Sequence, residues 1–310
     1  MNYLLIITSI ILSSVLIHLI QKAFLRKGVI DKINSRSSHS VTATRSGGIG
    51  VFLAIFLISS VSYVLEIGLY DYSFLIPLAI LAIIGLYDDV YNLDFKLKFI
   101  FQIIVAKIII DNGLLIDNLH GFLGIFEINR IIAQIFTLLI IVALINSINF
   151  IDGIDSLAKS MVILFVISFE FFINTQSPFI NLSFILIGSL IPLYYFNLKN
   201  NNKVFLGDSG SYFLGGLVSI YVIYTLTNSY IIKPGYDLNK ILFILSILFY
   251  PIIDLVRVSL LRILKGVSPF KADQNHIHHI INRFFDNQLY TLVVLISSSI
   301  IILIIFQIVF

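Results

Sequence analysis

Long apolar stretches separated by short polar connections occupy most of this chain. Ten of them are long enough, or nearly so, to cross about 30 Å of hydrocarbon. They lie near residues 2–21, 47–66, 73–87, 97–112, 131–148, 157–174, 179–197, 210–228, 240–260 and 289–309. Their apolar runs are uninterrupted, unlike the alternating segments of a barrel. The pattern therefore predicts an all-α, polytopic membrane bundle of about ten transmembrane helices, forming one domain over residues 1–310.

Composition supports a membrane protein. Of the 310 residues, 58% are hydrophobic and only 12% are charged, whereas a soluble domain carries about a quarter charged residues. The charges are too few to cover a surface that faces water. The chain has no cysteine, which excludes a disulfide framework.

The distribution of basic residues predicts the orientation. The apolar run 2–20 has no basic residue before it and three after it, the reverse of a cleaved signal peptide. By the positive-inside rule the N-terminus lies outside, and connections 22–46, 88–96, 149–156, 198–209 and 261–288 are cytoplasmic. All but four of the 20 Lys and Arg residues then fall at the cytoplasmic side; the exceptions are Lys107, Arg130, Lys233 and Lys240.

A polar stretch follows the fifth apolar segment. Asn146, Asn149, Asp152 and Asp155 are spaced three apart, so on a helix they would lie near one face. Gly153 allows a turn or the close approach of a ligand. Carboxylates at a membrane boundary are costly unless water, a cation or a partner meets them. A polar helix end reaching water explains one such group, but the four together favour a binding site.

Two further segments offer carboxylates. Asp88 and Asp89 repel each other unless a cation is near, so they indicate a Mg²⁺ site or a general base; solvated charge at a helix end is the alternative. In the segment Gly-Asp-Ser-Gly-Ser, Asp208 supplies a hard oxygen and Ser211 a phosphate contact at a helix start. Helix capping by Asp208 or Ser209 would explain it equally well.

Histidines gather in the last predicted loop. Three of the chain's six, His276, His278 and His279, fall within four residues. Without cysteine or a His-Glu-x-x-His pattern a zinc site is not indicated; phosphate contacts or proton transfer fit better, with a chance cluster as the alternative. The first loop, with His39 and Arg45, suits either anionic headgroup binding or a purely topogenic role.

All of these clusters fall on the predicted cytoplasmic side. They fit a Mg²⁺-dependent reaction on a phosphate-bearing substrate, with a lipid entering from the bilayer. No P-loop or kinase signature is present, so ATP hydrolysis is not expected. The alternatives are a membrane transporter for a phosphorylated or sugar substrate and an inactive scaffold. Transporters favour charges near the membrane midplane and inverted repeats, and neither is visible.

The ordered motifs resemble those of the polyprenyl-phosphate N-acetylhexosamine-1-phosphate transferases, which initiate O-antigen, enterobacterial common antigen and teichoic acid linkage synthesis in bacteria. The resemblance covers nearly the whole chain, and phospho-MurNAc-pentapeptide translocase is more distantly similar. The matching residues are Asp31, Asn34, His39 and Arg45 with Gly47-Gly48; Asp88-Asp89 with Leu93, Lys98 and Gln102; Asn146, Asn149, Asp152-Gly153 and Asp155; Gly207-Asp208, Gly210 and Ser211; and Pro251, Asp254 and Arg257 followed by Ser268-Pro-Phe, Asp273, His276, His278 and His279.

This resemblance implies transfer of a HexNAc-1-phosphate, GlcNAc by default, from a UDP-N-acetylhexosamine to undecaprenyl phosphate, with release of UMP. It implies Mg²⁺, for which Mn²⁺ could substitute, and a multi-pass protein of the bacterial inner membrane. The expected partners are the two substrates and the bilayer, with no nucleic acid and with a homodimer left open. The candidate catalytic residues are Asp88, Asp89, Asp152, Asp155 and His276. The candidate metal ligands are Asp208 and Asp89, and the candidate substrate-binding residues are Asn146, Asn149, His39, Arg45, Lys98, Ser211, Arg257, His278 and His279.

One residue departs from the family pattern. The usual Asp-Gly-x-Asp-Gly-Leu-Ala has Ser156 in place of its second glycine. If that turn needs a positive φ, serine there costs about 1 kcal/mol.

Overall fold

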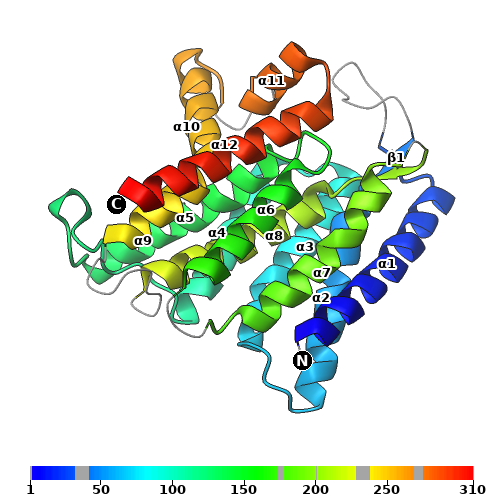
Figure 1. Cartoon of the computed structure of the whole chain (residues 1–310), viewed down its shortest axis with the longest axis horizontal. Coiled ribbons are helices and arrows are strands. Elements are labelled where there is room, and N and C mark those ends of the chain that lie inside the picture. Colours follow the sequence, from blue (N-terminus) through cyan, green and yellow to red (C-terminus); the bar gives the residue numbers. More distant parts are fainter. Residues whose placement is uncertain are drawn as a thin grey trace. The chain divides into compact units, whose positions relative to one another are not determined.

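The computed structural model describes residues 2–31, 42–173, 177–199, 201–227, 238–268 and 275–309, and most of them are helical (Figure 1). The helices are α1 (Asn2–Arg26), α2 (Gly47–Val64), α3 (Leu75–Tyr91), α4 (Phe95–Asp111), α5 (Arg130–Phe150), α6 (Leu157–Phe172), α7 (Ile180–Asn197), α8 (Gly207–Leu226), α9 (Leu238–Ile247), α10 (Phe249–Leu264), α11 (Ile277–Phe285) and α12 (Gln288–Val309). Two short strands, β1 (Ala43–Thr44) and β2 (Lys203–Val204), pair in parallel.

Each predicted apolar segment except the ninth corresponds to one helix. The ninth is divided into α9 and α10, which bend by 73° at their junction. Among the described residues, seven helices are long and apolar enough to cross a membrane, or up to eight if the bent pair counts as one. Helices α4 and α6, with 17 and 16 residues, are not among these seven. The chain is thus a multi-pass membrane protein; the count of ten and the orientation stay predictions.

The chain forms two compact units, and each contains parts distant in sequence. The first comprises Met1–Phe101 and Ser177–Leu214. In it α1 lies along α7 and α2, and α2 also packs against α3 (Figure 1). The hydroxyl of Ser13 on α1 donates to the carbonyl of Ser189 on α7 at 2.6 Å, which satisfies a buried polar group within the apolar contact. The prediction of one domain over the whole chain remains a prediction.

The second unit comprises Gln102–Gln176 and Gly215–Phe310. Here α12 packs against α9, α6, α10 and α11, and α10 packs against α5. Helices α5 and α8 approach closely at Gly215, where a Cβ would lie 2.6 Å from the Cα of Ile145. That spacing excludes any residue larger than glycine unless a helix moves. The predicted loop 261–288 also contains α11, a helix that the apolar pattern did not predict.

The helix that carries Asn146 and Asn149 does not continue through Asp152 and Asp155. Helix α5 ends at Phe150, so Asn146 and Asn149 are helical while Asp152 and Asp155 lie in the following turn. The expectation of one helical face therefore holds for the two amides and is wrong for the two carboxylates. The turn ends at Ser156, whose φ of 71° is left-handed. The positive φ anticipated for this position is present, and a serine occupies it.

We expect Ser156→Gly to stabilise the protein by up to about 1 kcal/mol, because glycine adopts a left-handed backbone without steric cost. The midpoint of thermal unfolding in detergent would measure the change. Ser160→Gly is the matched control, since Ser160 lies inside α6 and glycine there should lower stability by about 0.5–1 kcal/mol. A midpoint for Ser156→Gly at or below that of the unchanged protein would contradict the strain.

Candidate active site

In the first unit, a carboxylate from α3 caps the start of α8. The Asp89 carboxylate accepts hydrogen bonds from the backbone N–H groups of Asp208, at 2.8 Å, and Ser209, at 3.0 Å. These are among the N–H groups that a helix leaves unpaired at its first turn, and a negative charge there is favoured by the helix dipole. The Asp89 carboxylate therefore caps the start of α8.

Glycines make this approach of α3 to α8 feasible. A Cβ at Gly85 would lie 2.3 Å from the carbonyl oxygen of Asp208. Gly207 has a φ of +74°, and a Cβ there would lie 2.7 Å from an oxygen of Asp89. A side chain at either position would push the capping carboxylate away from α8.

Two basic residues compensate the acids at this end of the first unit. Lys98 forms an ion pair with buried Asp88, whose other carboxylate oxygen accepts the N–H of Leu93 at 2.8 Å. Arg45 pairs with Asp31 at 2.8 Å. Burial alone would lower the pKa of Arg45, but Asp31, Asp208 and Asp89 outweigh it and raise that pKa above its ordinary value. Arg45 is therefore a permanent positive charge beside the acids.

The carboxylates of Asp88 and Asp89 each interact electrostatically with that of Asp208. Among the described residues, no three His, Asp or Glu side chains are grouped so that they could hold a metal ion by themselves. Mg²⁺ commonly uses only one or two protein carboxylates and takes its other ligands from water and substrate phosphates. Asp208 and Asp88 fit that limited donor set. One oxygen of Asp88 is paired with the flexible side chain of Lys98, whereas both oxygens of Asp89 are held by backbone N–H groups of α8.

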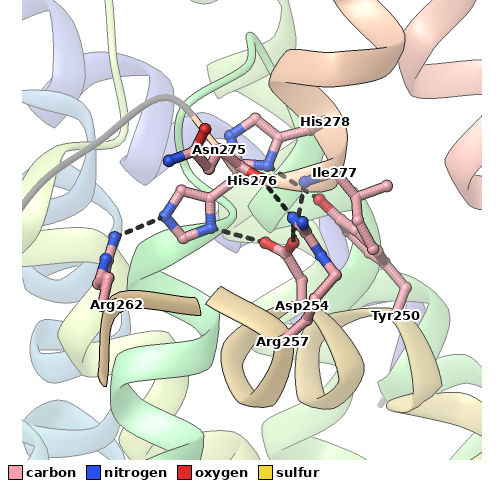
Figure 2. A network of polar contacts seen from close by, with 8 residues as sticks. All are labelled: Tyr250, Asp254, Arg257, Arg262, Asn275, His276, Ile277 and His278. Carbon is pink, nitrogen blue, oxygen red and sulfur yellow. Dashed lines mark hydrogen bonds and ion pairs between the residues drawn. The ribbon is translucent and has the colours of Figure 1, made fainter. Parts of the chain in front are cut away.

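In the second unit, a polar network joins α10 to the start of α11 (Figure 2). At its centre is Asp254, which is fully buried. Its carboxylate accepts from His276 Nδ1 at 2.7 Å, from the N–H of Ile277 at 2.8 Å and from Arg257 Nη2 at 3.0 Å. Arg257 also donates to the carbonyl of Asn275. A buried carboxylate is tolerated when donors surround it in this way.

The partners of His276 in this network determine which of its ring nitrogens carries the hydrogen. Its Nε2 lies 3.3 Å from Nη2 of Arg262, and a guanidinium can only donate. Nε2 must therefore accept, which leaves the hydrogen on Nδ1, where it faces Asp254. In this arrangement His276 is a neutral imidazole with both nitrogens occupied. The residue predicted as catalytic is thus held between two partners.

His278 lies on the other side of the network (Figure 2). Its Nδ1 is 3.0 Å from the hydroxyl of Tyr250, whereas Nε2 is buried without a hydrogen-bond partner in this structure. A Cβ added at Gly153 would lie 2.7 Å from that Nε2 and 3.3 Å from the ring of His279. Because Gly153 has no side chain, the rings of the two histidines occupy the space beside it. Burial, with His279 and His276 nearby, lowers the pKa of His278 to about 3.

The polar residues at the end of α5 and in the turn after it have partners as well. Asn146 donates to Oε1 of Gln102 on α4 at 2.7 Å and to the carbonyl of Val142 at 2.7 Å. Lys159 is buried and interacts electrostatically with Asp152 and Asp155. A buried lysine is costly to charge unless carboxylates are close, and Asp152 and Asp155 favour the charged form of Lys159.

The structure thus sorts the predicted residues into two groups, one in each unit. The first unit holds Arg45, Asp88, Asp89, Lys98, Asp208 and Ser211. The second holds Asn146, Asn149, Asp152, Asp155, Arg257, His276, His278 and His279. His39 lies outside the described residues. Ser211 is buried, with its hydroxyl 3.5 Å from the carbonyl of Asp208, too far for a strong hydrogen bond.

Several residues of these clusters were not candidate site residues from sequence. Tyr250 and Arg262 carried no signal, because an isolated tyrosine or arginine at a helix end is ordinary. Asp254 had one, since it precedes Arg257 by three residues on an apolar helix, where a carboxylate needs a partner. Lys159 had another, because it follows Asp155 by four.

Comparisons with known proteins agree with the motifs. A model of the family described as glycosyl transferase family 4 matches residues 72–226. A probable undecaprenyl-phosphate N-acetylglucosaminyl 1-phosphate transferase of Bacillus subtilis (strain 168) is 30% identical over 88% of this chain and 75% of its own length. Undecaprenyl-phosphate alpha-N-acetylglucosaminyl 1-phosphate transferases of Salmonella typhi and Escherichia coli (strain K12) are each 29% identical. They cover 94% and 90% of this chain and 80% and 76% of their own lengths.

We expect Asp254→Asn to lower the free energy of unfolding by about 1–3 kcal/mol, since an amide cannot accept from all the donors that now converge on the carboxylate. An NH₂ group facing His276 would also force that ring to move its hydrogen to Nε2, against Arg262. Asp286→Asn is the matched control, because Asp286 is exposed at a left-handed helix end where asparagine is tolerated. Equal unfolding midpoints in detergent for the two variants would contradict this role.

We expect stability to fall as the pH drops below about 6.5, because His278 resists protonation in the folded state down to about pH 3 while the unfolded chain takes up the proton near pH 6.5. In this window the unfolded state binds more protons, so stability increases with pH. Between about pH 6.5 and pH 5.5, the free energy of unfolding should fall by about 1 kcal/mol from this cause. Thermal unfolding at pH 5.5–7.5 should give a shallower pH dependence for His278→Gln, and identical slopes would contradict the assignment.

Proposed function

Because the chain belongs to glycosyl transferase family 4 and is a phosphoglycosyltransferase, we propose that it transfers N-acetylhexosamine-1-phosphate from a UDP-sugar to undecaprenyl phosphate and releases UMP. GlcNAc is the expected sugar, in keeping with the names of the relatives from B. subtilis, S. typhi and E. coli. The reaction would begin a cell-surface polysaccharide such as O-antigen, capsule or the teichoic acid linkage, at the bacterial inner membrane.

The observation that carries the proposal is the gathering of three carboxylates at the start of α8, beside two cations. Phosphoryl transfer between two anionic substrates needs groups that orient phosphates and compensate charge. In the first unit, Lys98 and Arg45 supply fixed positive charge next to Asp88 and Asp208. This mixture of acids and bases suits a phosphate-bearing substrate and a divalent cation together.

The proposed bond changes are those of a phosphoryl transfer. An oxygen of the lipid phosphate attacks the β-phosphorus of the UDP-sugar, the bond from that phosphorus to the bridging oxygen breaks, and UMP leaves with the electron pair. Asp88 would position the lipid phosphate or accept its proton, and Lys98 would hold Asp88 in place. Asp89 would act through the backbone, because its cap fixes the N–H groups and hence the side chain of Asp208.

Mg²⁺ is part of the proposal. Asp208 would hold it, with Asp88 as a second oxygen donor and Asp89 nearby. When bound, the ion would offset the charge of the diphosphate and favour departure of UMP.

The second unit would bind the nucleotide sugar. Its turn residues Asp152 and Asp155, with Asn149, offer hydrogen-bond acceptors and donors for a nucleotide or sugar. Arg257 and His279 offer donors for phosphate. Because His276 is neutral and occupied at both nitrogens, we assign it to positioning the start of α11 and not to proton transfer. Its predicted catalytic role becomes an indirect one in this proposal.

The transporter alternative loses its basis, because the matched family and the similar relatives are transferases. No feature of the described residues favours transport independently.

The test is UMP release by the purified protein in detergent, with undecaprenyl phosphate, Mg²⁺ and a panel of UDP-sugars. We expect UMP only when lipid phosphate and metal are both present, with UDP-GlcNAc preferred. We expect Asp208→Asn to reduce the rate at least about a hundredfold, because several kcal/mol of charge stabilisation are lost.

The matched control for that substitution is Asp111→Asn. Asp111 is an exposed carboxylate that pairs with Lys107 at the end of α4, so its loss should leave the rate within about twofold. Folded protein that yields no UMP with any of the sugars would overturn the proposal. A rate for Asp208→Asn equal to that of the control would overturn the metal-ligand role.

A further inference from the structure

Helix α11 is amphipathic, with its two faces sharply separated. At 100° per residue its five apolar residues fall on one arc of roughly 140°; they are Ile277, Ile280, Ile281, Phe284 and Phe285. The remaining arc carries His278, His279, Asn282 and Arg283. A helix of nine residues is only about 13 Å long, so it cannot cross a bilayer.

His278, on the polar arc of α11, faces the protein, whereas three residues of the apolar arc are exposed. His278 is fully buried, whereas the Phe284 side chain is 82% exposed and those of Ile280 and Phe285 are 46% and 42% exposed. This is the reverse of a helix on a water-facing surface, which buries its apolar stripe. A cluster of large apolar side chains that the protein does not cover marks an interaction surface.

The end of α10 is built in the same way. Arg262 is buried towards His276, while Leu260, Ile263 and Leu264 are exposed. Both helices that carry the Asp254 network therefore direct polar groups inward and apolar groups outward. A single apolar environment outside both helices explains why both expose apolar side chains.

The position of α11 in the chain indicates what that surrounding is. Only Asp286 and Asn287 separate it from α12, a candidate membrane span that is mostly exposed along its length and packs against α11. The first residues of α12, Leu289 and Tyr290, are exposed as well. The apolar arc is thus next to the point where a span begins, which is where the boundary of a bilayer lies.

We propose that α11 is an interfacial helix whose apolar arc is inserted in the lipid bilayer beside the start of α12. Phe284 lies at the level of the upper acyl chains, and Arg283, exposed on the polar arc, contacts lipid phosphates. On the opposite arc, His278 remains beside Tyr250. The bilayer thereby holds α11 from outside while Asp254 and Tyr250 hold it from inside.

Tryptophan fluorescence tests this placement directly, because the chain contains no tryptophan. Phe284→Trp places a single indole at an exposed position, where it should not disturb packing. In vesicles of phosphatidylcholine with phosphatidylglycerol, we expect blue-shifted emission. Lipids brominated near the carbonyl end of the acyl chains should quench it at least twice as strongly as lipids brominated near the methyl end.

Two further single-tryptophan variants calibrate the result. Ile301→Trp, on the exposed side of α12, should be quenched most by bromines deep in the bilayer. Arg283→Trp, one residue from the probe on the polar arc, should be quenched less by all brominated lipids and more by aqueous iodide. Size-exclusion profiles and unfolding midpoints establish that each variant is folded.

Two outcomes of this experiment would contradict the proposal, and each has a different meaning. Red-shifted emission from Phe284→Trp, quenched by iodide and not by brominated lipids, would mean that the arc faces water. Blue-shifted emission that neither quencher affects would mean that protein, such as a second copy of the chain, covers it. Both results contradict bilayer insertion, and neither depends on the transferase activity.

Discussion

A carboxylate beside hydrocarbon must be met by donors, and this requirement organises both polar clusters of the protein. Asp89 accepts two backbone N–H groups at the start of α8. Asp254 accepts one from the start of α11, together with His276 and Arg257. In each case a side chain from one helix closes the first turn of another. The interaction removes two costs at once, the unpaired helix N–H groups and the unpaired charge.

The same interaction separates acids that hold the first turn of a helix from acids that lie beside basic side chains. The oxygens of Asp89 and Asp254 are occupied by protein donors, so these residues fix where α8 and α11 begin. Asp88 and Asp208 lie beside that framework with basic neighbours, as groups that bind charged ligands do. Rigid support behind a few reactive groups is the arrangement that catalysis by positioning requires.

How well each feature could be predicted from the sequence depends on how many residues carry its pattern. Apolar runs of 15–20 residues predicted the helices because burial in hydrocarbon is a strong, local constraint. The family came from ordered motifs such as Asp88-Asp89 and Asp152-Gly153. The bend between α9 and α10 and the nine residues of α11 were missed, because neither changes the apolar content of a long window. The partners of His276 could not be predicted, since Asp254 and Arg262 reach it through folding and not through spacing.

The contact between Gly153 and the ring of His278 has a consequence for how the protein is made. Synthesis delivers the turn after α5 long before it delivers α11, so the space beside Gly153 stays unfilled until α11 has been made. Until then Asp152 and Asp155 lack the histidines that pack against their turn. The second unit can reach its final form only after α11 has been synthesised, and a contact this distant in sequence is costly to close early in folding. Assembly of this cluster therefore follows the synthesis of α11, whatever the other helices have already formed.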